Sequence, residues 1–267
     1  ALIGGVELGA VGHPAAVVHG DLGLGSGGQF ALAARQPRRE ALDELIAWFD
    51  TQLTKQQVEV RLNTAMTADE VSSGDWEEVI VATGSEPARD GYQRALPFQE
   101  RLPGVEADNV VAIDDVLAGD TNCGKRVLVL DDLGNWKGAG TALYLAERDH
   151  DVTIATRHPM IAPELVNSAA TAPLVRRMAE LKIKPLVDTV MLSWEGNVAA
   201  LKSTLDGGLV TREFDTLVLA TTNRPVRSLH DSLMGDENLS VHMIGDSLGA
   251  RRASAAIYEG RKLALEI

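Results

Sequence analysis

One pattern occurs twice in the sequence and restricts the fold more than any other feature. It consists of an acidic residue, three apolar residues, Ala-Thr, a turn and a proline. The first copy lies within residues 76–87 and the second within residues 214–225, where Thr216 is inserted after the acid. A short apolar run that ends in turn residues is typical of a buried strand. The two copies predict either two related α/β units or two unrelated buried strands with turns after them.

The C-terminal residues 239–267 add a further strand signal. A short apolar run ends at Gly245 and Asp246, and a helix rich in small residues is expected to begin near Ala253. An aspartate at a strand end can accept hydrogen bonds from ligand hydroxyls, and a helix N-terminus can donate N–H groups to phosphates. The same residues also suit an ordinary turn and helix cap. Alone, the segment is only suggestive of a nucleotide site.

Composition and charge limit the function classes. The 267 residues allow one large or two small domains, and 45% hydrophobic with 24% charged residues are ordinary for a globular protein. A net charge of −13 argues against nucleic-acid and anionic membrane partners. The single Cys123 excludes an intrachain disulfide and an iron–sulfur site made by this chain alone. No apolar run would span a bilayer and no convincing signal peptide is present, so we expect a cytoplasmic location.

Hydrophobic periodicity predicts the element order. Helices are expected at residues 40–53, 67–70, 114–117, 138–148 and 173–181, and strands at 15–18, 58–62, 79–81, 126–130, 151–156 and 183–187. Residues 191–214 predict an antiparallel meander. The strand–helix–strand order of residues 126–156 indicates a parallel sheet with a right-handed crossover. We therefore expect an α/β domain at 122–224, inserted into another built from 1–121 and 225–267.

These segments resemble the C-terminal dinucleotide-binding half of the flavoprotein family of trimethylamine dehydrogenase, histamine dehydrogenase and 2,4-dienoyl-CoA reductase. The match includes both Ala-Thr strands, the Gly245-Asp246 segment, the Gly-Gly-Gln helix start at residues 27–34 and the linker at 102–117. It covers nearly the whole chain. The resemblance implies two Rossmann-like domains, each with a parallel sheet and an antiparallel meander. The first would be of the FAD or ADP type and the inserted one of the NAD(P) type.

The resemblance also implies a site for FAD or ADP in the first domain. Asp246 would accept a hydrogen bond from a ribityl or ribose hydroxyl, and the helix at Ala253 would face the phosphates. The residues carried over to this site are Gly28, Gln29, Ala82, Thr83, Gly84, Gly245, Asp246 and Ala253.

The usual glycine fingerprint of the first domain is incomplete. Gly4 and Gly5 are its only remnant, and the next strand follows too soon for a full crossover helix. His19 and Asp21 either contact the ribose or are surface loop residues. Because the sequence starts at Ala1 rather than Met and within an apparent element, we expect a fragment or a processed form.

The inserted domain departs further from the family pattern. The three glycines of an NAD(P)H-binding turn would fall at the positions of Asp131, Leu133 and Trp136. A carboxylate and two larger side chains would repel and crowd a diphosphate. Arg157, after the next strand, either meets an NADP 2′-phosphate or is solvated. We predict that this domain does not bind NAD(P)H.

No catalytic constellation and no metal-ligand spacing emerge among the six histidines and the carboxylates. Family members carry an upstream FMN-binding TIM barrel with an iron–sulfur cluster, which oxidises the substrate. The leading hypothesis is therefore the dinucleotide-binding part or subunit of a flavin-dependent oxidoreductase of the amine dehydrogenase or demethylase kind. It would relay electrons or support an FMN-containing partner, with an electron-transfer flavoprotein as a second candidate partner. The alternatives are a non-catalytic docking module with eroded sites and a stand-alone NAD(P)H-dependent flavin reductase.

Overall fold

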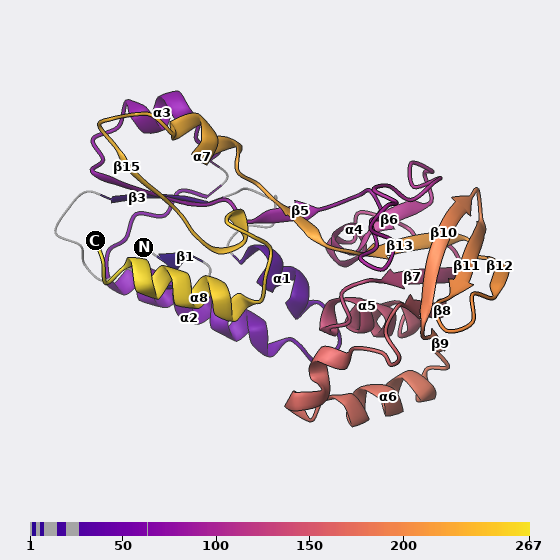
Figure 1. Cartoon of the computed structure of the whole chain (residues 1–267). Helices are drawn as coiled ribbons and strands as arrows, with labels where there is room; N and C mark the ends of the chain where they lie inside the picture. Colours follow the sequence, from indigo (N-terminus) through magenta and orange to yellow (C-terminus); the bar gives the residue numbers. More distant parts are fainter. Residues whose placement is uncertain (1, 4–5, 8–14, 20–26, 63) are drawn as a thin grey trace. The chain divides into compact units, whose positions relative to one another are not determined.

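The computed structural model describes residues 2–3, 6–7, 15–19, 27–62 and 64–267 (Figure 1). Contacts within the chain divide it into two compact units. Unit 1 is formed by Ala1–Ala31, Ala41–Glu86 and Asn223–Ile267, and unit 2 by Leu32–Glu40 and Pro87–Thr222. Most of unit 2 is thus a continuous insertion between two parts of unit 1. The fold class is the predicted one, a mixed α/β protein with parallel sheets.

Unit 2 is built on a five-stranded parallel sheet with the strand order β6-β13-β7-β8-β9. The adjacent inner strands β7 and β13 are apolar along nearly their whole length, as is typical of a parallel sheet that is covered on both faces. Their residues are buried in consequence, apart from the first residue of β7. The strands are β6 (Val110–Ala112), β7 (Arg126–Asp131), β8 (Asp151–Thr156), β9 (Lys184–Leu186) and β13 (Thr216–Ala220).

Helices and a meander cover this sheet. The two helices α4 and α5 contact each other as well as the strands, and β10 of the meander contacts β8. Trp194 and Met191 of β10 are buried in one apolar cluster with Leu128 and Leu217 of the sheet. The remaining elements are α4 (Ile113–Ala118), α5 (Trp136–Ala146), α6 (Thr171–Glu180), the 3₁₀ helix η1 (Pro163–Ser168), and the meander strands β10 (Thr189–Glu195), β11 (Val198–Ser203) and β12 (Leu209–Glu213).

Residues 87–121 belong to unit 2, whereas the sequence suggested a boundary at residue 121. The reason is strand pairing, since Val110 of β6 is in register with Leu217 of β13. Asn109, just before β6, accepts a hydrogen bond from the indole N–H of Trp194 at 3.0 Å. A strand that supplies one edge of the sheet cannot belong to the other unit.

Unit 1 contains a three-stranded parallel sheet with the order β15-β4-β3. Ile80 of β4 packs with Leu263 of α8, and Val79 and Val81 pack with Leu233 of α7, so both faces of β4 are buried. The elements are β1 (Leu2–Ile3), β2 (Val6–Glu7), β3 (Ala15–His19), α1 (Gly28–Ala34), α2 (Ala41–Lys55), α3 (Ala68–Ser72), β4 (Glu78–Ala82), β5 (Ser85–Pro87), β14 (Asn223–Pro225), α7 (Ser228–Leu233), β15 (Ser240–Met243), the 3₁₀ helix η2 (Gly245–Ser247) and α8 (Ala253–Leu263). The division between the units falls within α1.

Two sequence predictions for unit 1 are not met among its described residues. The expected meander is not found in its described residues, where the further strands form only the pairs β1-β2 and β14-β5. Residues 58–62 form no strand either, although their polarity alternates. Val60 and Leu62 are exposed, and among the described residues no strand pairs with this segment.

Within the described ranges of the chain, no helix combines the length and the apolar character needed to cross a membrane.

Candidate functional site

The ends of β4 and β15 bring the two sequence motifs of unit 1 together. Val81 is in register with Met243 of the parallel strand, so the segment from Ala82 to Gly84 and the Gly245-Asp246 segment lie at the same sheet edge. The Ile244 N–H donates to the Val81 carbonyl at 3.1 Å, which extends the pairing to the turn. Carboxyl edges of parallel strands are where α/β folds bind ligands.

Both turns at this edge use glycine in the left-handed region. Gly84 has a φ of 75° and Gly245 a φ of 68°, where a side chain is strained. The Ser247 hydroxyl lies within hydrogen-bonding distance of two carbonyls, those of Ile244 at 2.7 Å and Val81 at 3.1 Å, and anchors η2 to the end of β4. The backbone at the site is therefore fixed by the strand ends.

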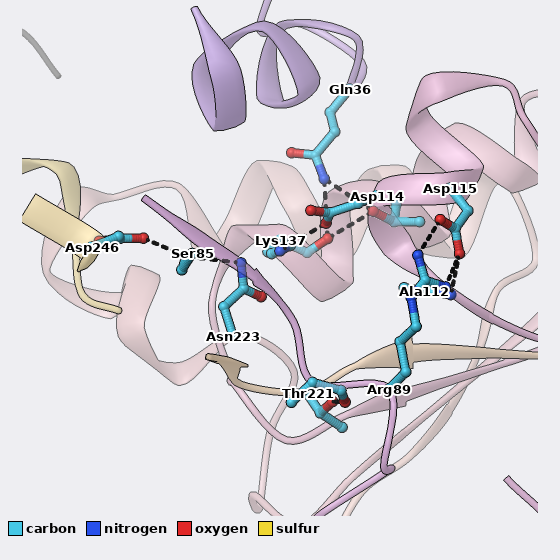
Figure 2. Close-up of polar contacts among 12 residues, drawn as sticks. Gln36, Ser85, Arg89, Ala112, Asp114, Asp115, Lys137, Thr221, Asn223 and Asp246 are labelled. Atoms are coloured by element: carbon cyan, nitrogen blue, oxygen red, sulfur yellow. Dashed lines mark hydrogen bonds and ion pairs between the residues drawn. The ribbon is translucent and has the colours of Figure 1, made fainter. Parts of the chain in front are cut away.

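The carboxylate of Asp246 is held at both oxygens. Its Oδ2 accepts a hydrogen bond from the Ser85 hydroxyl at 3.0 Å, and its Oδ1 accepts one from the Arg251 backbone N–H at 3.1 Å. The Asn223 carboxamide in turn donates to the Ser85 hydroxyl at 3.2 Å. Figure 2 shows the resulting chain from Asn223 through Ser85 to Asp246.

A second carboxylate, that of Glu259 in α8, approaches the same turn. It accepts the Gly245 N–H at 2.9 Å and pairs with the Arg251 guanidinium at 2.6 Å. Ala253 begins α8 as predicted, and its N-cap, Arg252, makes no side-chain cap hydrogen bond. The first N–H groups of α8 thus receive no hydrogen bond from the side chain of the N-cap residue. The Gly245 N–H, in contrast, already donates to Glu259.

The remaining predicted residues lie either at the start of α1 or, wholly or in part, outside the described part of the chain. Gly28, with a φ of 47°, and Gln29 begin α1 in unit 1. The contacts that hold Asp246 come from other elements, so their place at the site stays a prediction. Gly4, Gly5 and Asp21 lie outside the described residues, as does the side chain of His19.

The corresponding turn of unit 2 is filled by the protein itself. Asp131 is 1% exposed, and its carboxylate accepts the backbone N–H groups of Leu133 at 3.2 Å and Gly134 at 3.0 Å. Burial raises the pKa of Asp131 to about 6, although these two N–H groups act in the opposite direction. A side chain at Gly138 would lie 2.6 Å from Asp131 Oδ1, so this glycine makes room for the carboxylate. The Asp131 carboxylate thus engages two backbone N–H donors of this turn.

The neighbouring carboxylate of Asp132 forms ion pairs with two arginine side chains near this turn. It is 2% exposed, pairs with Arg94 at 2.7 Å and lies 3.2 Å from the Nε of Arg157. Arg157 was predicted either to bind a 2′-phosphate or to be solvated. In the structure it instead compensates a buried carboxylate, as a desolvated charge requires.

Sequence reasoning missed Ser85, Asn223 and Glu259. The repeated pattern could have revealed the first two, because each directly follows the turn after an Ala-Thr pair. Glu259 carries no such signal, since its contact depends on where α8 packs. Among the described residues, no group of three or more histidine, cysteine, aspartate or glutamate side chains could hold a metal ion.

Comparison with known proteins supports the family resemblance. No protein-family model matches the chain. A probable N-methylproline demethylase from Rhizobium meliloti is 28% identical over 270 residues, covering 90% of this chain and 38% of that protein. An N,N-dimethylglycine/sarcosine dehydrogenase from Chromohalobacter salexigens is 30% identical and covers 78% of this chain and 30% of its own length. The chain therefore spans about a third of these curated relatives.

Solved structures agree with this result. A 6-hydroxypseudooxynicotine amine oxidase from Pseudomonas geniculata N1 matches 97% of this chain and 42% of its own, with a TM-score of 0.88 and 27% identity. Histamine dehydrogenase from Rhizobium sp. 4-9, at 19% identity and a TM-score of 0.87, shows the same fold over 96% of the chain.

The chain is thus similar to one part of a class of proteins that are named as oxidoreductases, and it has the Rossmann-like fold of nucleotide-binding reductases. Within that class it is homologous to the C-terminal half of the trimethylamine, dimethylamine and histamine dehydrogenase family, as the sequence predicted.

Proposed function

We propose that unit 1 binds the adenine dinucleotide FAD, or ADP in its place, at the carboxyl edge of β4 and β15. The observation that carries this proposal is the meeting of Gly84 and Asp246 at that edge, each at the end of a parallel strand. Asp246 supplies an acceptor for a sugar or ribityl hydroxyl, and the start of α8 supplies N–H donors for phosphate. Gly28, Gln29, Ala82, Thr83, Gly245 and Ala253 complete the proposed site.

The sequence hypothesis assigned residues 1–121 and 225–267 to the nucleotide-binding domain. We keep this assignment except for residues 32–40 and 87–121, which pack in unit 2. The inserted domain, 122–224 by sequence, has the NAD(P)-type fold but does not bind NAD(P)H. Asp131 supports this, because a diphosphate would have to displace a buried carboxylate from its N–H donors.

The whole protein would be a flavin-dependent oxidoreductase acting on an amine. Support comes from the names of the relatives, which include a demethylase and dehydrogenases of methylated amines. FMN and an iron–sulfur cluster would belong to a TIM-barrel part or partner, and an electron-transfer flavoprotein could accept the electrons. We retain the cytoplasm as the proposed location.

The first test is the absorbance spectrum of the purified protein, with chromatographic identification of the nucleotide that heat releases. FAD or ADP in stoichiometric amount supports the proposal. Asp246→Ala should then weaken binding of that nucleotide about 10-fold or more, since a hydrogen bond to a charged group contributes about 1.5–3 kcal/mol. The matched control is Asp231→Ala, an exposed aspartate of α7 that should leave affinity unchanged. Equal affinity of Asp246→Ala and wild type would contradict the assignment.

A second candidate is a docking module without nucleotide. The contact of Glu259 with the Gly245 N–H favours it, because a side chain there takes the place of a ligand. A protein that is purified empty and binds neither FAD nor ADP in titrations would support this alternative. A stand-alone NAD(P)H-dependent reductase requires bleaching of the bound flavin by NADPH, which the filled turn at Asp131 disfavours.

A further inference from the structure

We propose that Ser85 and Asn223 are positioning residues that set the Asp246 carboxylate for the hydroxyl of the bound nucleotide. The inference rests on the proposed function, because it concerns the same site. It adds a chain of hydrogen bonds that crosses three segments distant in sequence, namely β5, β14 and η2 (Figure 2).

The direction of this chain follows from the chemistry of its groups. The Asn223 carboxamide nitrogen can only donate, so the Ser85 hydroxyl accepts from it at 3.2 Å. The hydroxyl proton is then free to point to Asp246 Oδ2, which lies 3.0 Å away and can only accept as a carboxylate. Asn223 therefore orients the Ser85 hydroxyl, and Ser85 donates to the carboxylate.

Burial makes this orientation strict. Ser85 is 1% exposed, so water cannot replace a lost partner, and a buried hydroxyl without a partner is costly. The Arg251 N–H holds the other oxygen, Oδ1, of Asp246. With one donor on each oxygen, the carboxylate cannot rotate freely, and its remaining lone pairs keep a fixed direction. A ligand hydroxyl then binds without having to order its acceptor.

The pairing of β5 with β14 has backbone and hydroxyl support that does not involve Ser85. The Val226 N–H donates to the Gly84 carbonyl at 3.0 Å, and the Thr83 hydroxyl donates to the Val226 carbonyl at 2.5 Å. These contacts should hold the two strands together when the Ser85 hydroxyl is removed. Loss of the Ser85 hydroxyl is therefore expected to change the orientation of the Asp246 carboxylate and to leave the pairing of β5 with β14 intact.

The experiment is calorimetric titration with ADP, repeated with FAD, on protein freed of nucleotide. Ser85→Ala should weaken binding about 10-fold, whereas Ser85→Thr keeps the hydroxyl and should restore most of the affinity. The decisive measurement is a double-mutant cycle with Asp246→Ala. If Ser85 acts through Asp246, the double variant binds no more weakly than Asp246→Ala alone. Independent, additive losses would overturn the inference.

Asn223→Asp provides a second test that does not remove a side chain. It replaces the donor by an acceptor, so the Ser85 proton faces two carboxylates, and binding should weaken as in Ser85→Ala. Denaturant unfolding of each variant confirms that affinity is measured on folded protein. Ser85→Ala with wild-type affinity, while Asp246→Ala binds weakly, would reject the inference and leave the proposed function standing. A wild-type protein that binds neither ADP nor FAD would reject the proposed function, and the inference with it.

Discussion

At the residue scale, Asp131 makes stability depend on pH in an unusual direction. Its pKa in the folded protein is about 6, above the ordinary value of 3.8, because burial disfavours the charged carboxylate. Between about pH 4 and pH 6 the folded state therefore binds a proton that the unfolded state has lost. By linkage, the contribution of this group to stability is largest below pH 4 and falls as pH rises to 6.

Asp131→Asn should remove this dependence. The amide oxygen can still accept the N–H groups of Leu133 and Gly134, but it does not titrate. Relative to wild type, the variant should gain up to about 3 kcal/mol in unfolding free energy between pH 4 and pH 7, as two pKa units imply. Urea unfolding at several pH values measures the gain. Asp151→Asn, at the exposed start of β8, is the control, and a pH-independent difference for Asp131→Asn would contradict the argument.

At the element scale, Gly104 lets the loop before β6 lie directly against β10. Its φ is +85°, and a Cβ there would lie 1.6 Å from the Trp194 carbonyl oxygen. The Trp194 N–H donates to the Pro103 carbonyl at 2.8 Å, so the backbones are joined at this point. Gly104→Ala must therefore displace the loop from the meander, and we expect a loss of about 3 kcal/mol from strain and overpacking together.

Gly196 separates the two causes. It also has a left-handed φ, +68°, but a Cβ there meets no heavy atom within 4 Å. Gly196→Ala should thus cost only the backbone strain, about 1–2 kcal/mol. Thermal and denaturant unfolding of both variants give the difference, which reports the clash at Gly104. Equal losses of unfolding free energy in the two variants would show that the loop at Gly104 moves away from Trp194 at little cost.

Sequence periodicity predicted the elements of unit 2 well, because buried strands and helices leave apolar patterns. The strand at 126–130, the helix at 173–181 and the meander are found within a few residues of their expected positions. It failed at 58–62, where alternation alone does not provide a partner strand. It could foresee the meeting of Gly84 and Asp246, which follows from parallel strand ends. It could not foresee Glu259 on the Gly245 N–H, because that contact depends on helix packing.

At the scale of the whole molecule, the division of the chain could be foreseen only in outline. The insertion of one unit into the other follows from the order of the two Ala-Thr strands. The boundary does not, because residues 110–112 can pair with either sheet as far as their sequence is concerned. Only the register of Val110 with Leu217 assigns them to unit 2. Asp131 was predicted from sequence to obstruct NAD(P)H binding, whereas its hydrogen bonds to the turn could be seen only in the structure.

The two units should therefore respond differently to nucleotides. A ligand that binds only the folded form stabilises it by about 2.7 kcal/mol at 100 times its Kd. Hydrogen exchange with FAD or ADP should accordingly slow about 100-fold for those amides of β4 and β15 that exchange through unfolding of unit 1. Amides of β7 and of the turn at Gly134 should be unchanged by NADPH at the same concentration, since Asp131 already occupies that turn. Protection of β7 by NADPH would show that the carboxylate yields to a diphosphate and that unit 2 is a working NAD(P)H domain. Protection of β4 and β15 alone would assign the nucleotide to unit 1.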